Sequence, residues 1–267
     1  MTTPLIESLQ NPLCKQIKQI QNPSKYNLPY YIIEHPKFIT DTLSRTPSML
    51  DCLLIDETNP RITFPDSKKR LIQQKIKRST TRLINQLSRL KNSSGIIAVM
   101  KRPTWDTFNI RSITHLIILD QVQSPQNVGA IVRSACAFGW DGILYTKGTA
   151  SPFHPESVNA STGLINRIPI LPYTSELRQT LTQQNMEFIT LDCHSKNTFL
   201  NTNIPKTCTL ILGNEGQGVL DPSLKELTTQ TLTWEMAPEV ESLNVSVAAG
   251  IGLYLLKNPI TNKTTHS

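Results

Sequence analysis

The feature that most constrains this fold is a regular alternation of strand-like and helix-like segments that begins at residue 113. Short apolar runs rich in β-branched residues are separated by stretches with helical periodicity. The predicted strands cover residues 115–121, 142–147, 167–173, 187–193, 209–213 and 231–236, and the predicted helices cover residues 127–138, 155–164, 174–185, 221–228 and 242–257. Strands that alternate with helices pair in parallel, and helices cover both faces of such sheets. The sequence therefore predicts an α/β fold with a mainly parallel sheet.

The residues before this alternation predict a second, smaller α/β unit. Its predicted helices cover residues 7–20 and 37–45, and its predicted strands cover residues 30–35, 52–56 and 95–100. A basic stretch over 68–91 is predicted to be partly helical. Residues 101–112 then break the periodicity with polar residues and a proline, which is typical of a linker. We therefore expect an N-terminal domain over 1–105, a linker over 106–112 and a C-terminal domain over 113–267.

The net charge of the chain is concentrated in the first of these domains. Residues 1–105 contain 17 Lys and Arg against 7 Asp and Glu, a net charge of +10, whereas residues 106–267 contain 10 against 13, a net charge of −3. A basic domain beside a nearly neutral one is typical of a nucleic-acid grip attached to a second function. The alternative is a basic surface that only contacts water.

Cysteine content and hydropathy exclude several other classes of protein. The five cysteines lie far apart and form no Cys-x-x-Cys pair, so neither a zinc site nor a disulfide framework is favoured. No run of about 18 apolar residues occurs, so we expect no membrane span. The first residues show no basic segment followed by an apolar one, so no secretory signal is expected. Together these features predict a reduced, cytoplasmic protein without a metal.

Open parallel sheets bind ligands beyond the carboxyl ends of their strands, and an unusual loop follows the first predicted strand of the larger domain. Asn127 stands where the N-cap of the next helix is expected. Arg133 follows six residues later, among small and apolar residues. An arginine there is costly unless its guanidinium reaches an anion or a pocket. The alternative is an arginine at the solvent edge of the helix.

A second unusual loop, "LILGNEGQGV" (210–219), combines glycines with a carboxylate. Gly213, Gly216 and Gly218 allow a close backbone approach, but the loop matches neither a Walker A sequence nor Gly-x-Gly-x-x-Gly. Glu215 would repel a bound phosphate. A carboxylate at this place suits a cationic ligand, a hydroxyl donor or a structural arginine. The alternative is an ordinary turn.

A third loop leads into the last predicted helix. Pro238 interrupts the chain, and Ser242 and Asn244 then precede a long helix of small and apolar residues. Serine is favoured at helix N-caps, so Ser242 is expected to cap this helix. Asn244 is then left without a structural task. Taken alone, this loop favours a structural interpretation.

Three motifs taken together resemble the SpoU-type (TrmH-like) RNA ribose 2′-O-methyltransferases of the SPOUT superfamily. They are "NVGAIVRSA" (127–135), "LILGNEGQGV" and "SLNVSVAAGIGLY" (242–254), in that order. A weaker match is "NASTGLINRIPI" (159–170), in which Asn159 stands where the family often has arginine. The segment 27–43 loosely matches a family pattern that usually carries Glu-Gly, and His35 replaces the glycine.

This resemblance implies a fold, a cofactor and a set of site residues. The implied fold adds a deep trefoil knot to the C-terminal domain, a feature too rare for spacing to indicate. The implied cofactor is S-adenosyl-L-methionine, and the implied assembly is a homodimer. The implied polar catalytic residues are Arg133, Asn127, Glu215, Ser242 and Asn244. The implied cofactor-binding residues are Gly213, Trp234, Met236 and Leu243.

The predicted function is S-adenosylmethionine-dependent methylation of a ribose 2′-hydroxyl in structured RNA. Ribosomal RNA is favoured because the two-domain layout resembles that of its modifying enzymes, and transfer RNA stays open. Another alternative is a catalytically inactive RNA-binding module of the same fold. A hydrolase that uses Ser242 with a histidine and an aspartate is disfavoured, because no Gly-x-Ser-x-Gly sequence occurs.

Overall fold

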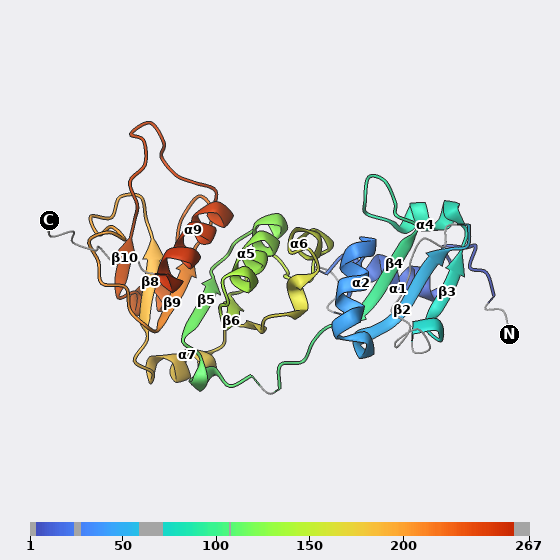
Figure 1. The fold of residues 1–267 in the computed structure, drawn as a ribbon, viewed down its shortest axis with the longest axis horizontal. Helices are drawn as coiled ribbons and strands as arrows, with labels where there is room; N and C mark the ends of the chain where they lie inside the picture. Colours follow the sequence, from blue (N-terminus) through green and yellow to red (C-terminus); the bar gives the residue numbers. More distant parts are fainter. Residues whose placement is uncertain (1–3, 24–27, 59–71, 107, 259–267) are drawn as a thin grey trace, which may run out of the picture. The chain divides into compact units, whose positions relative to one another are not determined.

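The computed structural model describes residues 4–23, 28–58, 72–106 and 108–258 (Figure 1). These residues divide into two units. Unit 1 takes its residues from Met1–Thr104 and Ser151–Asn166, and unit 2 takes its residues from Trp105–Ala150 and Arg167–Ser267. Both units are mixed α/β, as the sequence pattern predicts. None of the helices in the described residues has the length and apolar character that crossing a membrane requires.

Unit 1 is built on a four-stranded sheet in the order β1-β4-β2-β3. Its strands are β1 (Tyr30–Ile33), β2 (Leu50–Asp56), β3 (Ile76–Ser79) and β4 (Ile96–Lys101). Strand β4 lies antiparallel to both β1 and β2, whereas β3 lies parallel to β2. The helices are α1 (Pro12–Ile20), α2 (Pro36–Arg45), α4 (Thr81–Leu87) and α6 (Pro155–Ala160), with 3₁₀ turns at Pro47–Met49 and Leu164–Asn166. Side chains from α1, α4 and the sheet form one buried cluster.

One prediction for this unit needs correction, and the partly helical character predicted for the basic stretch is confirmed by α4. The helix predicted over 7–20 begins only at Pro12, because the Asn11 side chain accepts a hydrogen bond from the Leu13 amide and Pro12 occupies the first helical position. The basic stretch over 68–91 contains strand β3 as well as helix α4, and its first residues, 68–71, lie outside the described residues.

Residues 151–166 pack with unit 1 although they follow two strands of unit 2 in the chain. Helix α6 contacts strand β1. In the following turn, Gly163 has a φ of +76°, and a Cβ at that position would lie only 2.9 Å from the Cβ of Phe38 on α2. Glycine therefore permits both the turn and the close approach to α2. The predicted division into an RNA-binding and a catalytic domain remains a proposal.

Unit 2 contains a six-stranded sheet in the order β10-β8-β9-β5-β6-β7, and every adjacent pair is parallel. The strands are β5 (His115–Leu119), β6 (Gly142–Tyr145), β7 (Ile170–Pro172), β8 (Glu187–Leu191), β9 (Cys208–Leu212) and β10 (Gln230–Leu232). The helices are α5 (Pro125–Ala137), α7 (Ser175–Thr182), α8 (Pro222–Leu227) and α9 (Val245–Lys257), with a 3₁₀ turn at Ile110–Ser112. The parallel sheet predicted from the alternation is confirmed.

Helices cover both faces of this sheet. Ile211 of β9 belongs to a buried cluster that includes Leu181 of α7 and Leu224 of α8. On the other face, a Cβ at Gly252 of α9 would lie 3.5 Å from the Leu210 side chain. Successive residues of a strand point to opposite faces, so α9 lies across the sheet from α7 and α8. Helix α5 packs against α9. Strands β5 and β9 are fully buried between these layers.

Candidate active site

The three sequence motifs meet at the carboxyl ends of β5 and β9. These two strands are neighbours in the parallel sheet, with Leu119 opposite Leu212. The loop after β5 leads into α5, and the loop after β9 is the glycine-rich segment. Strand order therefore brings the first two motifs together at the sheet edge where parallel α/β folds bind ligands.

The glycine-rich loop closes on itself as a tight hairpin. The Asn214 amide donates to the Gly218 carbonyl at 2.8 Å, and the Gly218 amide donates back to the Asn214 carbonyl at 3.0 Å. Gly218 has a φ of +68°, a conformation that favours glycine. A Cβ at Gly213 would lie 2.2 Å from the Gly218 carbonyl carbon. The hairpin thus requires glycine at its base.

Asp120 holds the far end of this loop. Its fully buried carboxylate accepts hydrogen bonds from the Leu220 amide at 2.5 Å and from the Asp221 amide at 2.8 Å. The Thr146 hydroxyl also donates to it, at 2.8 Å. These contacts join the ends of β5 and β6 to the residues after the hairpin. The sequence interpretation treated Asp120 only as the end of a strand and missed this role.

Replacing Asp120 by alanine is expected to destabilise unit 2 by about 1–3 kcal/mol, because it leaves two partly buried backbone amides without their acceptor. Urea denaturation of the full chain measures this loss. Asp192→Ala is the matched control, since Asp192 also follows a strand of the same sheet but is exposed. Equal free energies of unfolding for the two variants would contradict this structural role of Asp120.

Glu215 lies at the tip of the hairpin and reaches the start of α5. Its carboxylate accepts hydrogen bonds from the Asn127 side-chain amide at 2.9 Å and from the backbone amides of Gln123 and Ser124 at 3.3 and 3.4 Å. Helix starts attract anions, and here the protein itself supplies the anion. The carboxylate that the sequence left unexplained is therefore a partner of helix α5.

The environment of Glu215 keeps it ionised at neutral pH. Partial burial acts to raise its pKa, but the hydrogen bonds from Asn127 and from backbone amides outweigh burial, and the net pKa lies below its ordinary value. A carboxylate with a lowered pKa stabilises the folded state above its unfolded pKa, and this contribution is lost as the pH falls through the lowered value. The contact between loop and helix therefore persists at neutral pH.

A chain of side-chain hydrogen bonds extends from Glu215 to the third motif. The Asn127 side-chain oxygen accepts from the Asn244 side-chain amide at 3.1 Å. The Asn244 side-chain oxygen in turn accepts from the Ser246 amide at 2.9 Å and from the Ser246 hydroxyl at 2.6 Å, at the start of α9. Glu215, Asn127 and Asn244 thus connect residues that are far apart in the sequence.

The structure corrects two predicted helix caps. Ser124, not Asn127, caps α5, because Pro125 occupies the first helical position and the Ser124 hydroxyl accepts from the Asn127 amide at 3.3 Å. Asn244, not Ser242, caps α9. The first shift frees the Asn127 side chain for Glu215, and the second gives Asn244 the structural task that the sequence interpretation had not found for it.

Arg133 and Ser242 stand outside this network. Arg133 is exposed on α5, between the buried residues Val132 and Ala135. Ser242 is exposed in the segment before α9. Neither side chain has a hydrogen bond or an ion pair with any of the described residues. Of the five polar residues implied by resemblance, the structure therefore brings together three and leaves these two facing solvent.

Three of the four implied cofactor-binding residues follow the ends of strands, and the fourth precedes a helix. Gly213 follows β9, Trp234 and Met236 follow β10, and Leu243 precedes α9; all four are half-buried. The Trp234 ring lies 6.0 Å from the Phe199 ring, centroid to centroid. The Phe199 amide donates to the Thr233 carbonyl at 3.1 Å and so fixes this neighbour. Sequence analysis did not identify Phe199, because no local pattern links it to Trp234.

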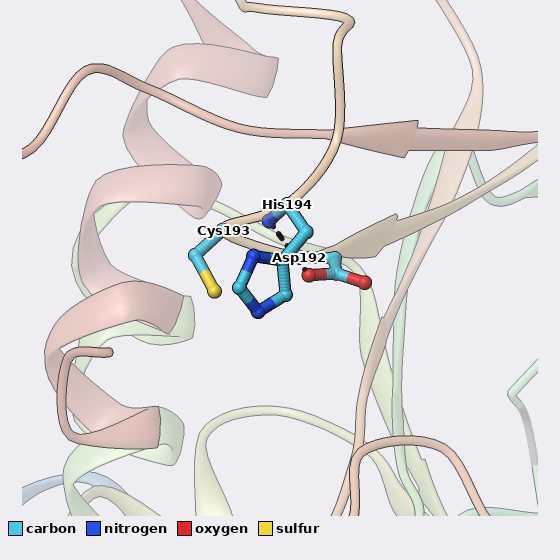
Figure 2. Close-up of side chains that lie close together, drawn as sticks. All are labelled: Asp192, Cys193 and His194. Carbon is cyan, nitrogen blue, oxygen red and sulfur yellow. Dashed lines mark hydrogen bonds between the residues drawn. The ribbon is translucent and has the colours of Figure 1, made fainter. Parts of the chain in front are cut away.

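Three consecutive residues after β8 form the one grouping of potential metal ligands found among the described residues. Figure 2 shows the side chains of Asp192, Cys193 and His194, whose ligand atoms lie within 4.8 Å of one another. All three residues are exposed, and the His194 amide donates to the Asp192 carboxylate at 2.9 Å. Structural zinc sites use four protein ligands, and catalytic sites use three that are held by further contacts. We assign no metal to this turn.

Comparisons with known proteins agree with the motifs. The model of the SpoU rRNA Methylase family matches residues 114–254. An uncharacterised tRNA/rRNA methyltransferase of Synechocystis is 28% identical over 93% of this chain and 92% of its own length. The 23S rRNA (guanosine(2553)-2′-O)-methyltransferase of Bacillus subtilis is 27% identical over 94% of this chain and 98% of its own length.

A solved structure shows the same fold. The crystal structure of an rRNA methyltransferase from Sinorhizobium meliloti superposes with a TM-score of 0.78 at 21% sequence identity, covering 96% of this chain and 98% of that chain. The same protein with AdoMet bound superposes with a TM-score of 0.75. At this level of identity the likeness concerns the fold alone.

Proposed function

Because the chain belongs to the SpoU rRNA Methylase family, we propose that it is an RNA methyltransferase that acts on a ribose 2′-hydroxyl in structured RNA, with ribosomal RNA as its substrate. The observation that carries this proposal is the hydrogen-bonded series Glu215, Asn127 and Asn244 beside the glycine hairpin. The relative from Bacillus subtilis, which is named for 2′-O-methylation of ribosomal RNA, supports the choice of atom and of RNA.

The methyl donor is S-adenosylmethionine, and the residues of unit 2 fit it. Structures with this fold have been solved with AdoMet bound. In this chain, the glycine hairpin exposes backbone groups beyond β9, while Trp234, Met236 and Leu243 offer half-buried aromatic and apolar surface. An adenosine needs such apolar contact together with a few polar groups from the backbone. The carboxylate of Glu215 keeps this edge of the sheet suited to a cationic ligand.

The chain's own residues orient the reaction. S-adenosylmethionine supplies an activated methyl group on a sulfonium. The ribose 2′-oxygen forms the new bond to the methyl carbon while the carbon–sulfur bond breaks, and the hydroxyl proton passes to water or to a phosphate oxygen. Arg133 binds the phosphate beside the target ribose through its fork of N–H donors. The network of Glu215, Asn127 and Asn244 keeps the two loops in place, and Ser242 bonds the substrate.

The basic residues before the linker form the RNA grip in this proposal. Among the described residues, exposed cations of unit 1 include Lys77 and Arg78 on β3, Arg82 on α4, and Arg89 and Lys91 after it. Binding through phosphates releases counterions, so the logarithm of the RNA association constant is expected to fall linearly with the logarithm of salt concentration. Fluorescence anisotropy with labelled rRNA fragments measures this slope. An association constant that does not depend on salt would contradict RNA binding by these basic residues.

Resemblance also implies a trefoil knot and a homodimer, and an exposed apolar patch on α9 supports the dimer. Val247 and Tyr254 are each 51% exposed, and the Tyr254 ring contacts Phe138 of α5 edge-on at 5.6 Å. Two copies of one such surface form a two-fold interface. Tyr254→Glu is expected to convert a dimer into a monomer in light scattering. Leu200→Glu, at an equally exposed leucine of unit 2, is the control and should remain dimeric.

Mapping of 2′-O-methylated riboses tests the proposed function. RNA from cells that lack this protein is expected to have lost one methylated ribose in ribosomal RNA, and the purified protein with S-adenosylmethionine should restore it. Loss in transfer RNA instead would move the substrate to the alternative class. Binding of S-adenosylmethionine with no turnover on either RNA would favour a catalytically inactive RNA-binding module.

A further inference from the structure

Unit 1 contains a pocket that the proposed methyl transfer does not use. A pocket of about 70 Å³ lies between the end of β1, the start of α2, the residues after α4 and helix α6. Its lining combines apolar side chains with the polar residues Glu34, His35, Arg89, Glu156 and Asn159. A concave site with a few polar groups among apolar ones is the usual form of a ligand-binding site.

Two stacked rings form one part of this lining. The rings of His35 and Phe38 lie 4.4 Å apart, centroid to centroid, with an interplanar angle of 26°. Pro36 begins α2 between them and fixes the backbone. Gly163 lies close to Phe38, since a Cβ at Gly163 would be 2.9 Å from the Phe38 Cβ. The pair therefore offers a rigid aromatic surface, of which His35 is the exposed member.

A buried carboxylate fixes the polar part of the lining. Glu34 is 8% exposed, and its carboxylate accepts from the Arg89 amide at 3.0 and 3.2 Å and from the Ser88 hydroxyl. These bonds hold the backbone of Arg89 at the pocket wall. The side chains of Arg89 and Asn159 are exposed, and neither has a hydrogen-bond partner among the described residues. Their donors are available to a ligand.

We propose that this pocket binds one unstacked base of the substrate RNA, an inference that rests on the proposed function. Proteins read single-stranded RNA by stacking bases on aromatic rings and by hydrogen bonds to the base edges. The pocket offers both, within a unit whose chain segment carries most of the positive charge. A free phosphate does not suit it, because Glu34 and Glu156 are part of the lining.

The donors and acceptors of the lining favour guanine. Arg89 only donates, and arginine pairs with O6 and N7 of guanine more often than with any other base. The exposed Asn159 side chain also offers an acceptor oxygen, and guanine has two adjacent N–H groups at N1 and N2. Both demands are met by one base. The expected order of affinity therefore begins with guanine.

The same pocket contains two positions at which this chain departs from the pattern that it resembles. His35 replaces a glycine, and Asn159 stands where an arginine is frequent. These residues are far apart in the sequence, yet both line this pocket. A glycine at position 35 would provide no ring, so the stacked pair depends on His35. The pocket thus sets which RNA this chain selects, rather than the methyl transfer itself.

Anisotropy with short single-stranded RNAs tests the proposal. The probes are fluorescein-labelled heptamers of uridine whose central base is G, A, C or U, and the protein is the full chain. The native chain should bind the G probe about tenfold more tightly than the all-uridine probe. His35→Gly and Arg89→Ala should each reduce this ratio to near one. Arg82→Ala, which removes the same charge from α4 outside the pocket, should weaken all four probes alike and keep the ratio.

The outcomes separate the pocket from the proposed function. Thermal unfolding of each variant shows whether it folds. If one of the two pocket variants fails to fold, the other still tests the proposal. The proposal that the pocket binds a base is contradicted if both folded variants keep the preference of the native chain. It is also contradicted if the native chain shows no preference. A preference that disappears in both variants supports it, even if no RNA is methylated. Methylation of ribosomal RNA that survives in variants without preference supports the proposed function separately.

Discussion

Arg133→Ala is expected to lower kcat for methyl transfer about 10²- to 10³-fold, while the affinity for S-adenosylmethionine stays near normal. Arg133 is exposed and has no partner among the described residues, so its removal costs the fold little. It follows Asn127 on the same helix, whose start is tied to the glycine hairpin through Glu215. The variant is therefore expected to lose positioning of the RNA while it keeps binding of S-adenosylmethionine. Single-turnover kinetics and calorimetry measure the two quantities separately.

The chemistry of the guanidinium decides between two roles for Arg133. A general base must release its proton near neutral pH, and a guanidinium does not. A phosphate anchor needs only its charge and its fork of donors, which fix the 2′-oxygen in line with the methyl group. The anchor role predicts that added guanidinium partly restores the activity of Arg133→Ala, with little dependence on pH between neutral and mildly alkaline conditions.

The control for this experiment is Arg178→Ala on α7. Arg178 forms an exposed ion pair with Glu226 at 3.0 Å and lies outside the three motifs. Its loss should leave kcat unchanged. Rescue that increases about tenfold per pH unit, as expected if each unit supplies ten times more of a neutral base, would favour the base role. Full activity of Arg133→Ala would exclude both roles.

Gly213→Ala is expected to remove detectable binding of S-adenosylmethionine. The added Cβ would lie 2.2 Å from the Gly218 carbonyl carbon and 2.4 Å from both the Gly218 oxygen and the Val219 nitrogen. All three are backbone atoms, so the hairpin must open to make room. The clash thus applies even to a single methyl group at this position.

Gly216 supplies a matched control within the same loop. A Cβ there would have its nearest neighbour, the Asn214 side-chain oxygen, at 3.9 Å. Gly216→Ala should therefore keep the hairpin and most of the affinity. Titration calorimetry on both variants, with circular dichroism to confirm folding, makes the comparison. Normal affinity in Gly213→Ala would show that the hairpin is not part of the cofactor site.

Local patterns in the sequence predict the sheet well, because burial of a parallel strand shows in a short apolar run. The strands predicted over 115–121 and 209–213 correspond closely to β5 and β9. Contacts between distant residues leave no such pattern. Asp120 reaches amides about a hundred residues away, and Phe199 supports Trp234 from another loop. Such contacts depend on strand order, which periodicity does not specify.

The structure brings together three of the predicted site residues, Asn127, Glu215 and Asn244, in an arrangement that depends on helix capping. Asn127 and Asn244 were recognised, yet their mutual hydrogen bond depends on which residue caps each helix. A proline at the first helical position moved one cap from Asn127 to Ser124. A shift of three residues in the cap of α5 thus separates a capping asparagine from one that bonds Glu215.

The carboxylate at the start of α5 has a consequence for discrimination among the adenosine compounds of a cell. ATP and S-adenosylmethionine share the adenosine group, but one carries a polyanionic tail and the other a sulfonium cation. An open helix start beside an adenosine site would attract the polyphosphate. Here Glu215 already takes the backbone amides of Gln123 and Ser124. Because Glu215 fills this anion position, we expect this edge of the sheet to bind S-adenosylmethionine in preference to ATP.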